Sequence, residues 1–513
     1  MIGITLSEKD FDYEIQALVN SFFPGNRSQV NGEQGDLHIA INLGDTEISV
    51  SVETKSGNLE RSAVVSGAED WHKKEGKTAH PYRTYYKNVL KKLLYMILKE
   101  FPESHFPEGM RRRIPEWGTM TGVRPTKIPM NALLAGKTEE EVFLELQEVY
   151  CCSSEKARLG VDISRREANI LKQSSYNGGY SLYVGIPFCP TTCLYCSFPS
   201  YPYEQFGHLA ADYVNALKQE ISGVAHSMKG KPLTSVYIGG GTPTTLTGLQ
   251  LRDVIQHIQE SFPVEDATEF TVEAGRPDSI MEEKLLALRE RGVNRISINP
   301  QTMQQKTLDL IGRRHTVEQT IQAFAMAREL GFTNINMDLI IGLPGETVED
   351  FANTLNRIKS LAPDSLTIHS LVVKRASGLR EVLEAQGDFL MAEQIRGERM
   401  EEMLAMGEKF AGEQGYHPYY MYRQKNSAGH AGSSGQENIG YAREGCECLY
   451  NILIMEEMQT ILAVGAGAST KLYHPDRRQV SRIENVKSVT DYIERVDEMV
   501  ARKVDALEKQ EIS

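Results

Sequence analysis

Three features are absent from the chain of 513 residues, and each absence argues against a class of protein. No apolar run reaches the length of a membrane-spanning helix, and the N-terminus MIGITLSEKDFDYEIQ lacks the basic and apolar segments of a secretory signal. A basic excess is missing too: the formal net charge is -13, which argues against a surface built for phosphate contacts. We therefore expect a cytoplasmic protein with no membrane span and no nucleic-acid partner.

Cysteine is scarce as well, with seven residues in the whole chain. An odd, small number does not fit an extracellular disulfide framework. Two close pairs, Cys151 with Cys152 and Cys446 with Cys448, are interpreted as idle thiols, with a fourth metal ligand or a redox relay as the alternative. The other three lie within eight residues, in YVGIPFCPTTCLYCSFPSY: Cys189, Cys193 and Cys196.

The CxxxCxxC spacing of these three cysteines predicts a metal site. Iron–sulfur clusters are held by Cys thiolates, and a [4Fe-4S] cluster with three protein ligands leaves one iron open to another molecule. Structural zinc is the alternative, but it needs four closed ligands, and no second pair or His follows at suitable spacing. We therefore expect an iron–sulfur cluster with an open coordination position.

Length and composition are those of a folded protein with about three domains. A hairpin pattern at residues 37–54 and a one-sided apolar helix at residues 84–101 predict a small α+β unit at the N-terminus. Thr138 and Glu141 fit a capping box. The expected domains are an N-terminal α+β domain at 1–105, a helical connector at 106–177, a partial barrel at 178–375 and a C-terminal α+β extension at 376–513.

An alternation of strand-like and helix-like segments between residues 178 and 375 predicts the α/β fold class. Such alternation is typical of a parallel sheet with right-handed crossovers, and ligands then bind at the carboxyl ends of the strands. Six units predict a partial (β/α)6 barrel. The strand-like runs are SLYVGI, TSVYIG, EFTVEA, RISIN, NINMDLI and SLTIHSL.

Polar and glycine-rich motifs follow these strands or lie late in them, so they should meet at one mouth of the barrel. The segment GGGTP, residues 239–243, follows the second run, and glycines let a backbone approach a ligand closely. Helix caps and surface salt bridges are the alternative interpretation of the single polar residues. These residues are Glu273, Gln301, Arg313 and Asp338.

CxxxCxxC with an aromatic residue before the last Cys resembles the signature of the radical S-adenosylmethionine (SAM) superfamily. The resemblance implies a [4Fe-4S] cluster whose open iron is chelated by SAM. It further implies that one electron cleaves SAM to methionine and a 5'-deoxyadenosyl radical, which abstracts hydrogen from unreactive C–H bonds. The protein itself would then bind and orient the reacting molecules and exclude solvent.

Within that superfamily, IPFCPTTCLYCSF, GGGTP, RISINPQ, IGRRH and MDLIIGLPGET together resemble the oxygen-independent coproporphyrinogen III oxidase and haem-chaperone family. NIGYAREGCECLYNILIMEEMQTILAVGAGAST, PYYMYRQKN and WGTMTGVRPTK resemble its HemZ-type branch, the coproporphyrinogen dehydrogenases. The resemblance implies that the three cysteines are the cluster ligands. It implies SAM contacts, divided between two SAM molecules in the porphyrinogen enzyme, from Tyr183, Tyr195, Gly240, Gly241, Thr242, Glu273, Gln301, Arg313 and Asp338, of which Tyr183, Glu273 and Arg313 are expected to be catalytic.

Two positions depart from that family's pattern. Gly185 stands where the family commonly has His, and Phe198 stands where the porphyrinogen enzyme has an extra Cys, which is the chaperone-like choice. The chaperone's own His-Asn-x-x-Tyr-Trp pattern would align at residues 437–442, where the His and the Trp are both missing.

The activity implied is oxidative decarboxylation of two propionates of coproporphyrinogen III to vinyl groups, giving protoporphyrinogen IX at a cost of two SAM. The expected partners are the porphyrinogen, an external electron donor of flavodoxin or ferredoxin type and an electron acceptor, and a monomer is expected. The alternatives are a haem-binding, chaperone-like protein and a radical SAM enzyme acting on another substrate.

Three further segments have both a functional and a plain interpretation. Arg124 or Lys127 could contact a substrate or partner, or their loop could simply connect. His369, Lys374 and Arg375 could bind propionates, or could form a solvated basic patch. GAGAS, residues 465–469, could approach the SAM adenosine or form a plain tight turn.

Overall fold

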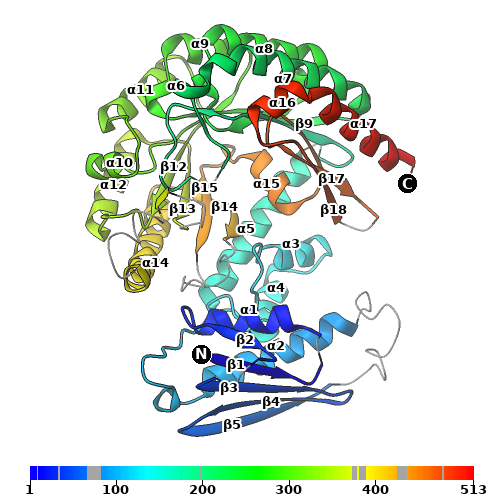
Figure 1. Ribbon diagram of the computed structural model, residues 1–513, viewed down its shortest axis with the longest axis vertical. Helices are drawn as coiled ribbons and strands as arrows, with labels where there is room; N and C mark the ends of the chain where they lie inside the picture. Colours follow the sequence, from blue (N-terminus) through cyan, green and yellow to red (C-terminus); the bar gives the residue numbers. More distant parts are fainter. Residues whose placement is uncertain are drawn as a thin grey trace. The chain divides into compact units, whose positions relative to one another are not determined.

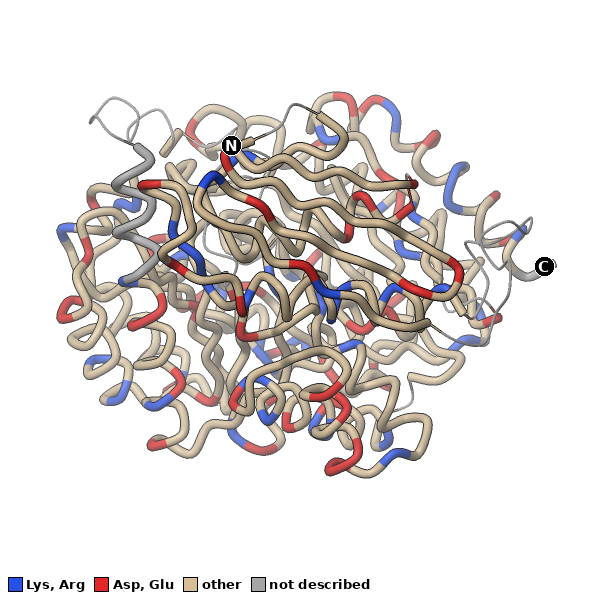
Figure 2. The backbone as a smooth tube through the Cα atoms, turned by 90° about the horizontal axis from the view of Figure 1, so that it is seen from below, with Lys and Arg blue, Asp and Glu red and all other residues tan. Residues whose placement is uncertain are grey.

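The structure is a computed structural model that describes residues 1–8, 10–32, 35–65, 82–174, 176–196, 198–372, 378–379, 389–424, 436–476 and 479–512 (Figure 1). The chain divides into two compact units. The first comprises Met1–Arg165, Asp388–Glu398 and Tyr422–Glu437, and the second Arg166–Gly387, Arg399–Met421 and Asn438–Ser513. Figure 2 shows basic and acidic positions interspersed along the described backbone.

The first unit is built on a five-stranded sheet with strand order β2-β1-β3-β4-β5. Residues in β3 and β4 alternate between buried and more exposed positions, as expected for a sheet with one covered face. Their antiparallel pairing confirms the predicted hairpin. The elements are β1 (Ile2–Leu6), α1 (Asp12–Phe22), β2 (Ser28–Val30), β3 (Leu37–Leu43), β4 (Glu47–Thr54), β5 (Gly57–Val64) and α2 (Tyr82–Glu100).

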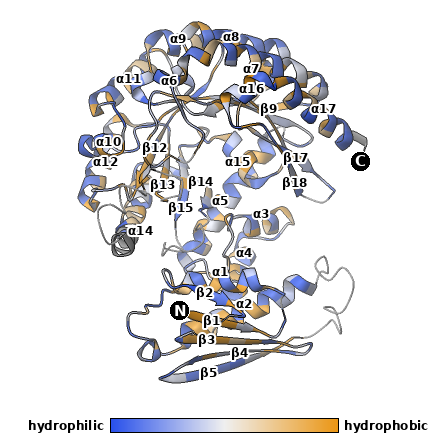
Figure 3. Ribbon diagram, in the orientation of Figure 1, coloured by the Kyte–Doolittle hydropathy of each residue, from blue (hydrophilic) through white to orange (hydrophobic). Residues whose placement is uncertain are grey.

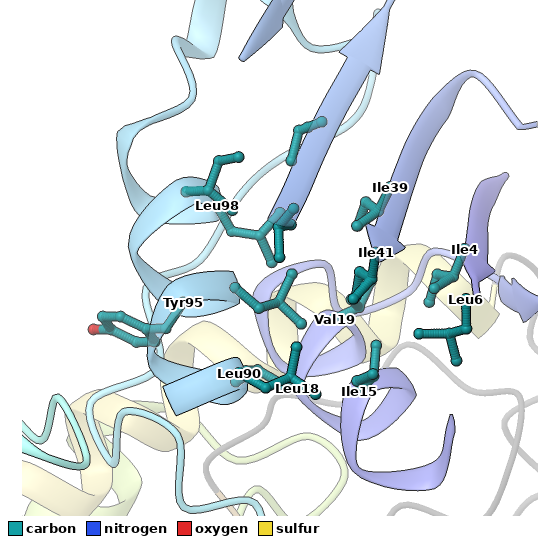
Figure 4. Close-up of a cluster of buried hydrophobic side chains, with 14 of the residues drawn as sticks. Ile4, Leu6, Ile15, Leu18, Val19, Ile39, Ile41, Leu90, Tyr95 and Leu98 are labelled. Atoms are coloured by element: carbon teal, nitrogen blue, oxygen red, sulfur yellow. The ribbon is translucent and has the colours of Figure 1, made fainter. Parts of the chain in front are cut away.

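Helices α1 and α2 pack on this sheet through one shared core (Figure 4). Ile15, Leu18 and Val19 of α1 are fully buried, and Leu90 and Leu98 of α2 are too. In Figure 3 the strands of this sheet include strongly hydrophobic stretches, whereas α2 carries both colours. The core lies within the first 101 residues, so the N-terminal segment has its own source of hydrophobic stabilisation.

The first unit also has a helical part. It contains α3 (Lys127–Leu134), α4 (Glu139–Glu148) and the start of α5 (Ser154–Gln173). Thr138 and Glu141 form the predicted capping box at α4. Glu437 is buried and accepts hydrogen bonds from Trp117 Nε1 at 2.7 Å and Lys156 Nζ at 2.8 Å. The residue that replaces the chaperone's His is therefore part of a buried ion pair.

The second unit contains an eleven-stranded sheet with order β14-β15-β13-β12-β11-β10-β9-β6-β16-β17-β18. Six consecutive strands in this order, β6 and β9 to β13, are parallel, which confirms the predicted (β/α)6 partial barrel. Their bounds are β6 (Tyr180–Ile186), β9 (Leu233–Gly240), β10 (Glu269–Gly275), β11 (Arg295–Ile298), β12 (Ile335–Ile341) and β13 (Ser365–Ser370).

Amphipathic helices connect these strands and form the outer layer of the unit (Figures 1 and 3). Three of them begin at a capping box, which defines the start of α8, α11 and α12. Their bounds are α6 (Tyr203–Phe206), α7 (Ala210–Ala225), α8 (Gly248–Ser261), α9 (Glu282–Glu290), α10 (Gln305–Leu310), α11 (Val317–Glu329) and α12 (Val348–Leu361).

The C-terminal part adds strands to both edges of this sheet. β16 pairs in parallel with β6, and β15 pairs antiparallel with β13. The bounds are α14 (Phe389–Glu413), β14 (His417–Arg423), β15 (Glu437–Ala442), α15 (Leu449–Glu456), β16 (Thr460–Val464), β17 (Ser469–His474), β18 (Gln479–Glu484), α16 (Val489–Glu494) and α17 (Val496–Ile512). Among the described helices, none combines the length and the apolar character needed to cross a membrane.

Candidate functional site

The three cysteines lie in a loop that follows β6 at the carboxyl end of the parallel strands. This cysteine loop, residues 189–196, runs between the short paired strands β7 (Phe188–Cys189) and β8 (Tyr201–Pro202). All three side chains are half-buried free thiols. Leu194 and Tyr195 anchor the loop because they pack on a buried hydrophobic group formed by Ile311, Ile340, Leu343, Leu371 and Leu379.

The glycine segment, residues 239–243, lies directly against the start of the cysteine loop. Gly241 N donates to Ile186 O and Thr242 N donates to Phe188 O, both at 2.7 Å. Thr242 Oγ1 is 3.7 Å from Cys189 Sγ. A Cβ atom on Gly241 would lie 2.9 Å from that sulfur and 2.5 Å from Phe188 O, so only glycine fits here.

Tyr183 and Glu273 meet through a tyrosine that the sequence analysis did not select. Tyr237 of β9 stacks on Tyr183 of β6 with ring centroids 6.2 Å apart, and its hydroxyl donates to Glu273 Oε1 at 2.5 Å. Tyr450 of α15 completes the stack, 4.4 Å from Tyr237. Burial raises the pKa of Glu273 to about 7; the Tyr237 hydrogen bond opposes this rise and the charge of Asp338 adds to it.

Gln301 and Asp338 are joined through the backbone. Gln301 N donates to Asp338 O at 3.0 Å, and Gln301 has a positive φ of 70°, which is unusual for a non-glycine residue. Asp338 Oδ1 accepts from Asn336 Nδ2 at 2.7 Å and lies 4.0 Å from His369 Nε2. His369 therefore faces the predicted site, while Lys374 and Arg375 are outside the described residues.

Arg313 links the cysteine loop to β11. It is buried, and it donates from Nη1 to Tyr195 Oη at 3.0 Å and from Nη2 to Asn299 O at 2.7 Å. The predicted residues thus meet in separate contacts: Arg313 with Tyr195, Gln301 with Asp338, Thr242 with Cys189, and Glu273 with Tyr183 through Tyr237.

The turn GAGAS follows β16 and lies beside Gly185. The hydroxyl of Tyr213 donates to Gly185 O at 2.6 Å and accepts from Ala466 N at 3.0 Å. A Cβ atom on Gly465 would come within 2.5 Å of Gly185 O. Gly185, one of the two departures from the family pattern, therefore packs against this turn.

The donor set fits the predicted cofactors. Gly241 leaves room beside Cys189 Sγ that a Cβ atom would fill. Among the described residues, buried Gln301 Oε1 and Arg313 Nε have no hydrogen-bond partner, as expected for atoms that await a polar ligand. No three Cys, His, Asp or Glu side chains in the described ranges are close enough to hold a single metal ion. A cubane places its ligands around several metals, so it needs a wider set of sulfurs.

Sequence reasoning missed Tyr237, Tyr450 and Arg276. Tyr237 did have a sequence signal, because it precedes a glycine by two residues, as Tyr183 does. The structure pairs these two tyrosines on the neighbouring strands β6 and β9. Tyr450 lies on a helix far along the chain, and Arg276 precedes a proline in a loop; neither pattern indicates a site.

The parallel sheet, the cysteine loop and the glycine segment define the class of protein. The chain matches the radical SAM superfamily over residues 183–358. It is also 36% identical over 502 residues, 96% of this chain and 95% of the relative, to the oxygen-independent coproporphyrinogen-III oxidase-like protein HemZ of Bacillus subtilis (strain 168). The chain belongs to this HemZ-type family of radical SAM proteins.

Over shorter stretches, the chain is also similar to a heme chaperone and to oxygen-independent coproporphyrinogen III oxidases. The chain is 34% identical to the heme chaperone HemW of Bacillus subtilis (strain 168), over 51% of this chain and 66% of that protein. It is 37% identical to the oxygen-independent coproporphyrinogen III oxidase of Escherichia coli (strain K12), over 37% of this chain and 41% of that protein. The solved structure of coproporphyrinogen III oxidase (HemN) from Escherichia coli, a radical SAM enzyme, aligns with a TM-score of 0.48 and 26% identity, covering 63% of this chain and 70% of that one.

Family membership establishes the cofactors. Radical SAM proteins use a [4Fe-4S] cluster and S-adenosylmethionine, and these are the cofactors of this chain. Similarity to oxidases and to chaperones defines the family without selecting one activity.

Proposed function

We propose that the protein oxidatively decarboxylates coproporphyrinogen III to protoporphyrinogen IX without oxygen. The observation that supports this is the similarity over nearly the whole chain to an oxygen-independent coproporphyrinogen-III oxidase-like protein, combined with the contacts of Thr242 and Arg313 with the cysteine loop. Each round removes one hydrogen atom, one carbon dioxide and one electron from a propionate and leaves a vinyl group. Two rounds convert one porphyrinogen.

Cys189, Cys193 and Cys196 would hold the cluster, whose open iron would bind SAM. When bound, the two cofactors supply a carbon-centred oxidant strong enough to remove hydrogen from a propionate. Gly240, Gly241 and Thr242 would bring backbone groups close to SAM. Four further residues would contact its polar groups. Glu273 lies on β10 and Asp338 on β12, Gln301 follows β11, and Arg313 lies between α10 and α11.

Tyr183, Glu273 and Arg313 are the proposed catalytic residues, and each has a specific physical task. Tyr183 offers a half-buried ring that is fixed by stacking on Tyr237. Glu273, whose pKa is raised to about 7, is partly ionised near neutral pH and would offer its negative charge to the cationic ligand. Arg313 keeps Tyr195 and the cysteine loop in place and keeps a buried positive group at the mouth. An external protein of flavodoxin or ferredoxin type would donate the electron that cleaves SAM, and an external acceptor would take the electron released from the propionate in each round.

An anaerobic turnover experiment tests the proposal. Reconstituted protein, coproporphyrinogen III, SAM and a chemical reductant are expected to give protoporphyrinogen IX by mass spectrometry, with two methionines per porphyrin. Cys193→Ser is expected to lose both iron and turnover, whereas Cys446→Ser, outside the cysteine loop, should retain both. Cleavage of SAM by the wild-type protein without any vinyl product would contradict the proposed substrate.

Haem binding is a second candidate, and one observation favours it. Phe198, which replaces the extra cysteine of the porphyrinogen enzyme, is 71% exposed two residues after Cys196. An exposed aromatic ring is suited to contact a flat tetrapyrrole. Titration with haem monitored by absorbance distinguishes the two functions: stoichiometric binding that weakens in Phe198→Ala, without turnover of porphyrinogen, would favour haem delivery.

A further inference from the structure

Arg276 is a buried cation directly behind the cysteine loop. It follows β10 and is only 4% exposed. Its Nη1 donates to Thr191 Oγ1 at 2.6 Å and to Thr191 O at 3.0 Å. The same nitrogen lies 3.9 Å from Cys193 Sγ. Arg276 therefore contacts the short stretch between the first two cysteines and one of the cysteines themselves.

Asp278 fixes the orientation of this guanidinium. Arg276 Nε donates to Asp278 Oδ1 at 3.0 Å and Nη2 donates to Oδ2 at 2.6 Å, in a bidentate arrangement. With two nitrogens engaged by the carboxylate, the third can point only toward the loop. Thr191 is also held from the other side, because its Oγ1 donates to Gly312 O at 3.1 Å.

We propose that Arg276 is a positioning residue that fixes the cysteine loop and raises the reduction potential of the cluster. This inference rests on the proposed cluster site. Hydrogen bonds and positive charge near the cluster sulfurs stabilise the more negative, reduced state. Asp278 neutralises part of the charge, but it binds Nε and Nη2, so Nη1 still faces the loop and lies 3.9 Å from Cys193 Sγ.

A purely structural role for the Arg276–Asp278 pair predicts a different result. In that case, loss of Arg276 would lower stability or iron content without moving the potential of the cluster that remains. Lys at position 276 would keep the positive charge but could not make both the bidentate contact and the two contacts with Thr191. The reduction potential therefore separates the two roles.

The experiment measures cluster content and potential in the anaerobic full-length protein without substrate. Iron and sulfide are quantified, and the reduced cluster is titrated by electron paramagnetic resonance against potential. In Arg276→Met we expect the ratio of reduced to oxidised cluster at fixed potential to fall about tenfold, which is about 59 mV for one electron. Arg276→Lys should shift less. Arg314→Met is the control, because it removes the same charge from an exposed arginine next to Arg313, where water screens that charge.

Two results would overturn the inference, and both differ from failure of the proposed function. If Arg276→Met retains the cluster at the wild-type potential, Arg276 does not tune it. If Arg314→Met shifts the potential as much as Arg276→Met, net charge and not the buried contact is responsible. Absence of a cluster from reconstituted wild-type protein would instead refute the proposed site as a whole.

Discussion

At the scale of single residues, the surroundings of Glu273 determine the pH at which its carboxyl group ionises. Its carboxylate lies among Tyr183, Tyr237 and Tyr450, and burial raises its pKa to about 7. A carboxylate in water would be ionised well below neutral pH. Here the group changes charge within the range where the protein can be studied, so its proposed contact with SAM can be tested by pH.

We expect SAM to bind about tenfold more weakly at about pH 6 than at about pH 8, because protonation of Glu273 removes a negative charge from the proposed site of this cationic ligand. Equilibrium binding of SAM measured by calorimetry checks this. Glu273→Gln is the control. In this variant SAM binding should still respond to titration of the amino group of SAM itself, but the part of the pH dependence that comes from Glu273 should be lost. In Tyr237→Phe the midpoint should move upward, since the lost hydrogen bond favours the ionised form. An unchanged pH profile in Glu273→Gln would contradict the assignment.

Gly241 provides a steric prediction at the same scale. A methyl group there would overlap Phe188 O and Cys189 Sγ, and backbone cannot yield as a flexible side chain can. Gly241→Ala is therefore expected to lose most of its iron after reconstitution, as measured by metal analysis. Gly412→Ala is the matched control, because nothing lies within 4 Å of the added atom and alanine favours the helix. Equal iron content in the two variants would count against close packing of the glycine segment on the cluster site.

At the scale of elements, the C-terminal helix α17 is tied to α7 by a buried charge network. Lys503 and Glu220 form an ion pair with no exposed surface, and Asn485 bridges them. Glu220 also accepts from Gly465 N at 2.8 Å and from the hydroxyl of Tyr492. The last helix thereby supports the GAGAS turn next to β6.

Removing one partner of the Lys503–Glu220 pair should destabilise the folded protein, because it leaves the other buried charge uncompensated. Lys503→Met is expected to lower the free energy of unfolding by about 3–5 kcal/mol, and adding Glu220→Gln should restore much of the loss. Chemical denaturation monitored by circular dichroism measures both. Lys509→Met, which removes an exposed lysine from the same helix, should change stability by less than about 0.5 kcal/mol. Similar losses in the two lysine variants would show that burial of the pair is unimportant.

Local sequence patterns predicted the helices and strands themselves more completely than they predicted which distant strands pair with one another. The six parallel strands, the hairpin and the capping box follow from periodicity and turn residues, which act over a few positions. Pairing of β16 with β6 joins segments that are 280 residues apart in sequence, as in Thr460 with Tyr180, and no periodicity encodes that choice. The motif residues of the site were selected from the sequence, but Tyr237, Arg276 and Tyr450 were not, since their roles depend on contacts.

At the scale of the whole molecule, the first unit has a hydrophobic core that does not draw on the parallel sheet. Its buried residues lie between Ile2 and Phe101, and Ile114 packs on its border. A core of this kind, formed by two helices on one face of a five-stranded sheet, is of the size that supports independent folding. We propose that the expected N-terminal domain, residues 1–105, folds as a separate domain.

A fragment of residues 1–114 is therefore expected to unfold cooperatively on its own in thermal and chemical denaturation. Leu18→Ala, which removes a fully buried side chain, should lower its stability by about 2–5 kcal/mol through lost burial and a residual cavity. Tyr13→Ala is the control on the same helix, because Tyr13 is 68% exposed and should matter little. In the full-length protein the same Leu18→Ala should leave cluster content and reduction potential unchanged, since the proposed cluster ligands belong to the other unit. A fragment without a cooperative transition, or a cluster lost from full-length Leu18→Ala, would mean that the two units depend on each other for folding.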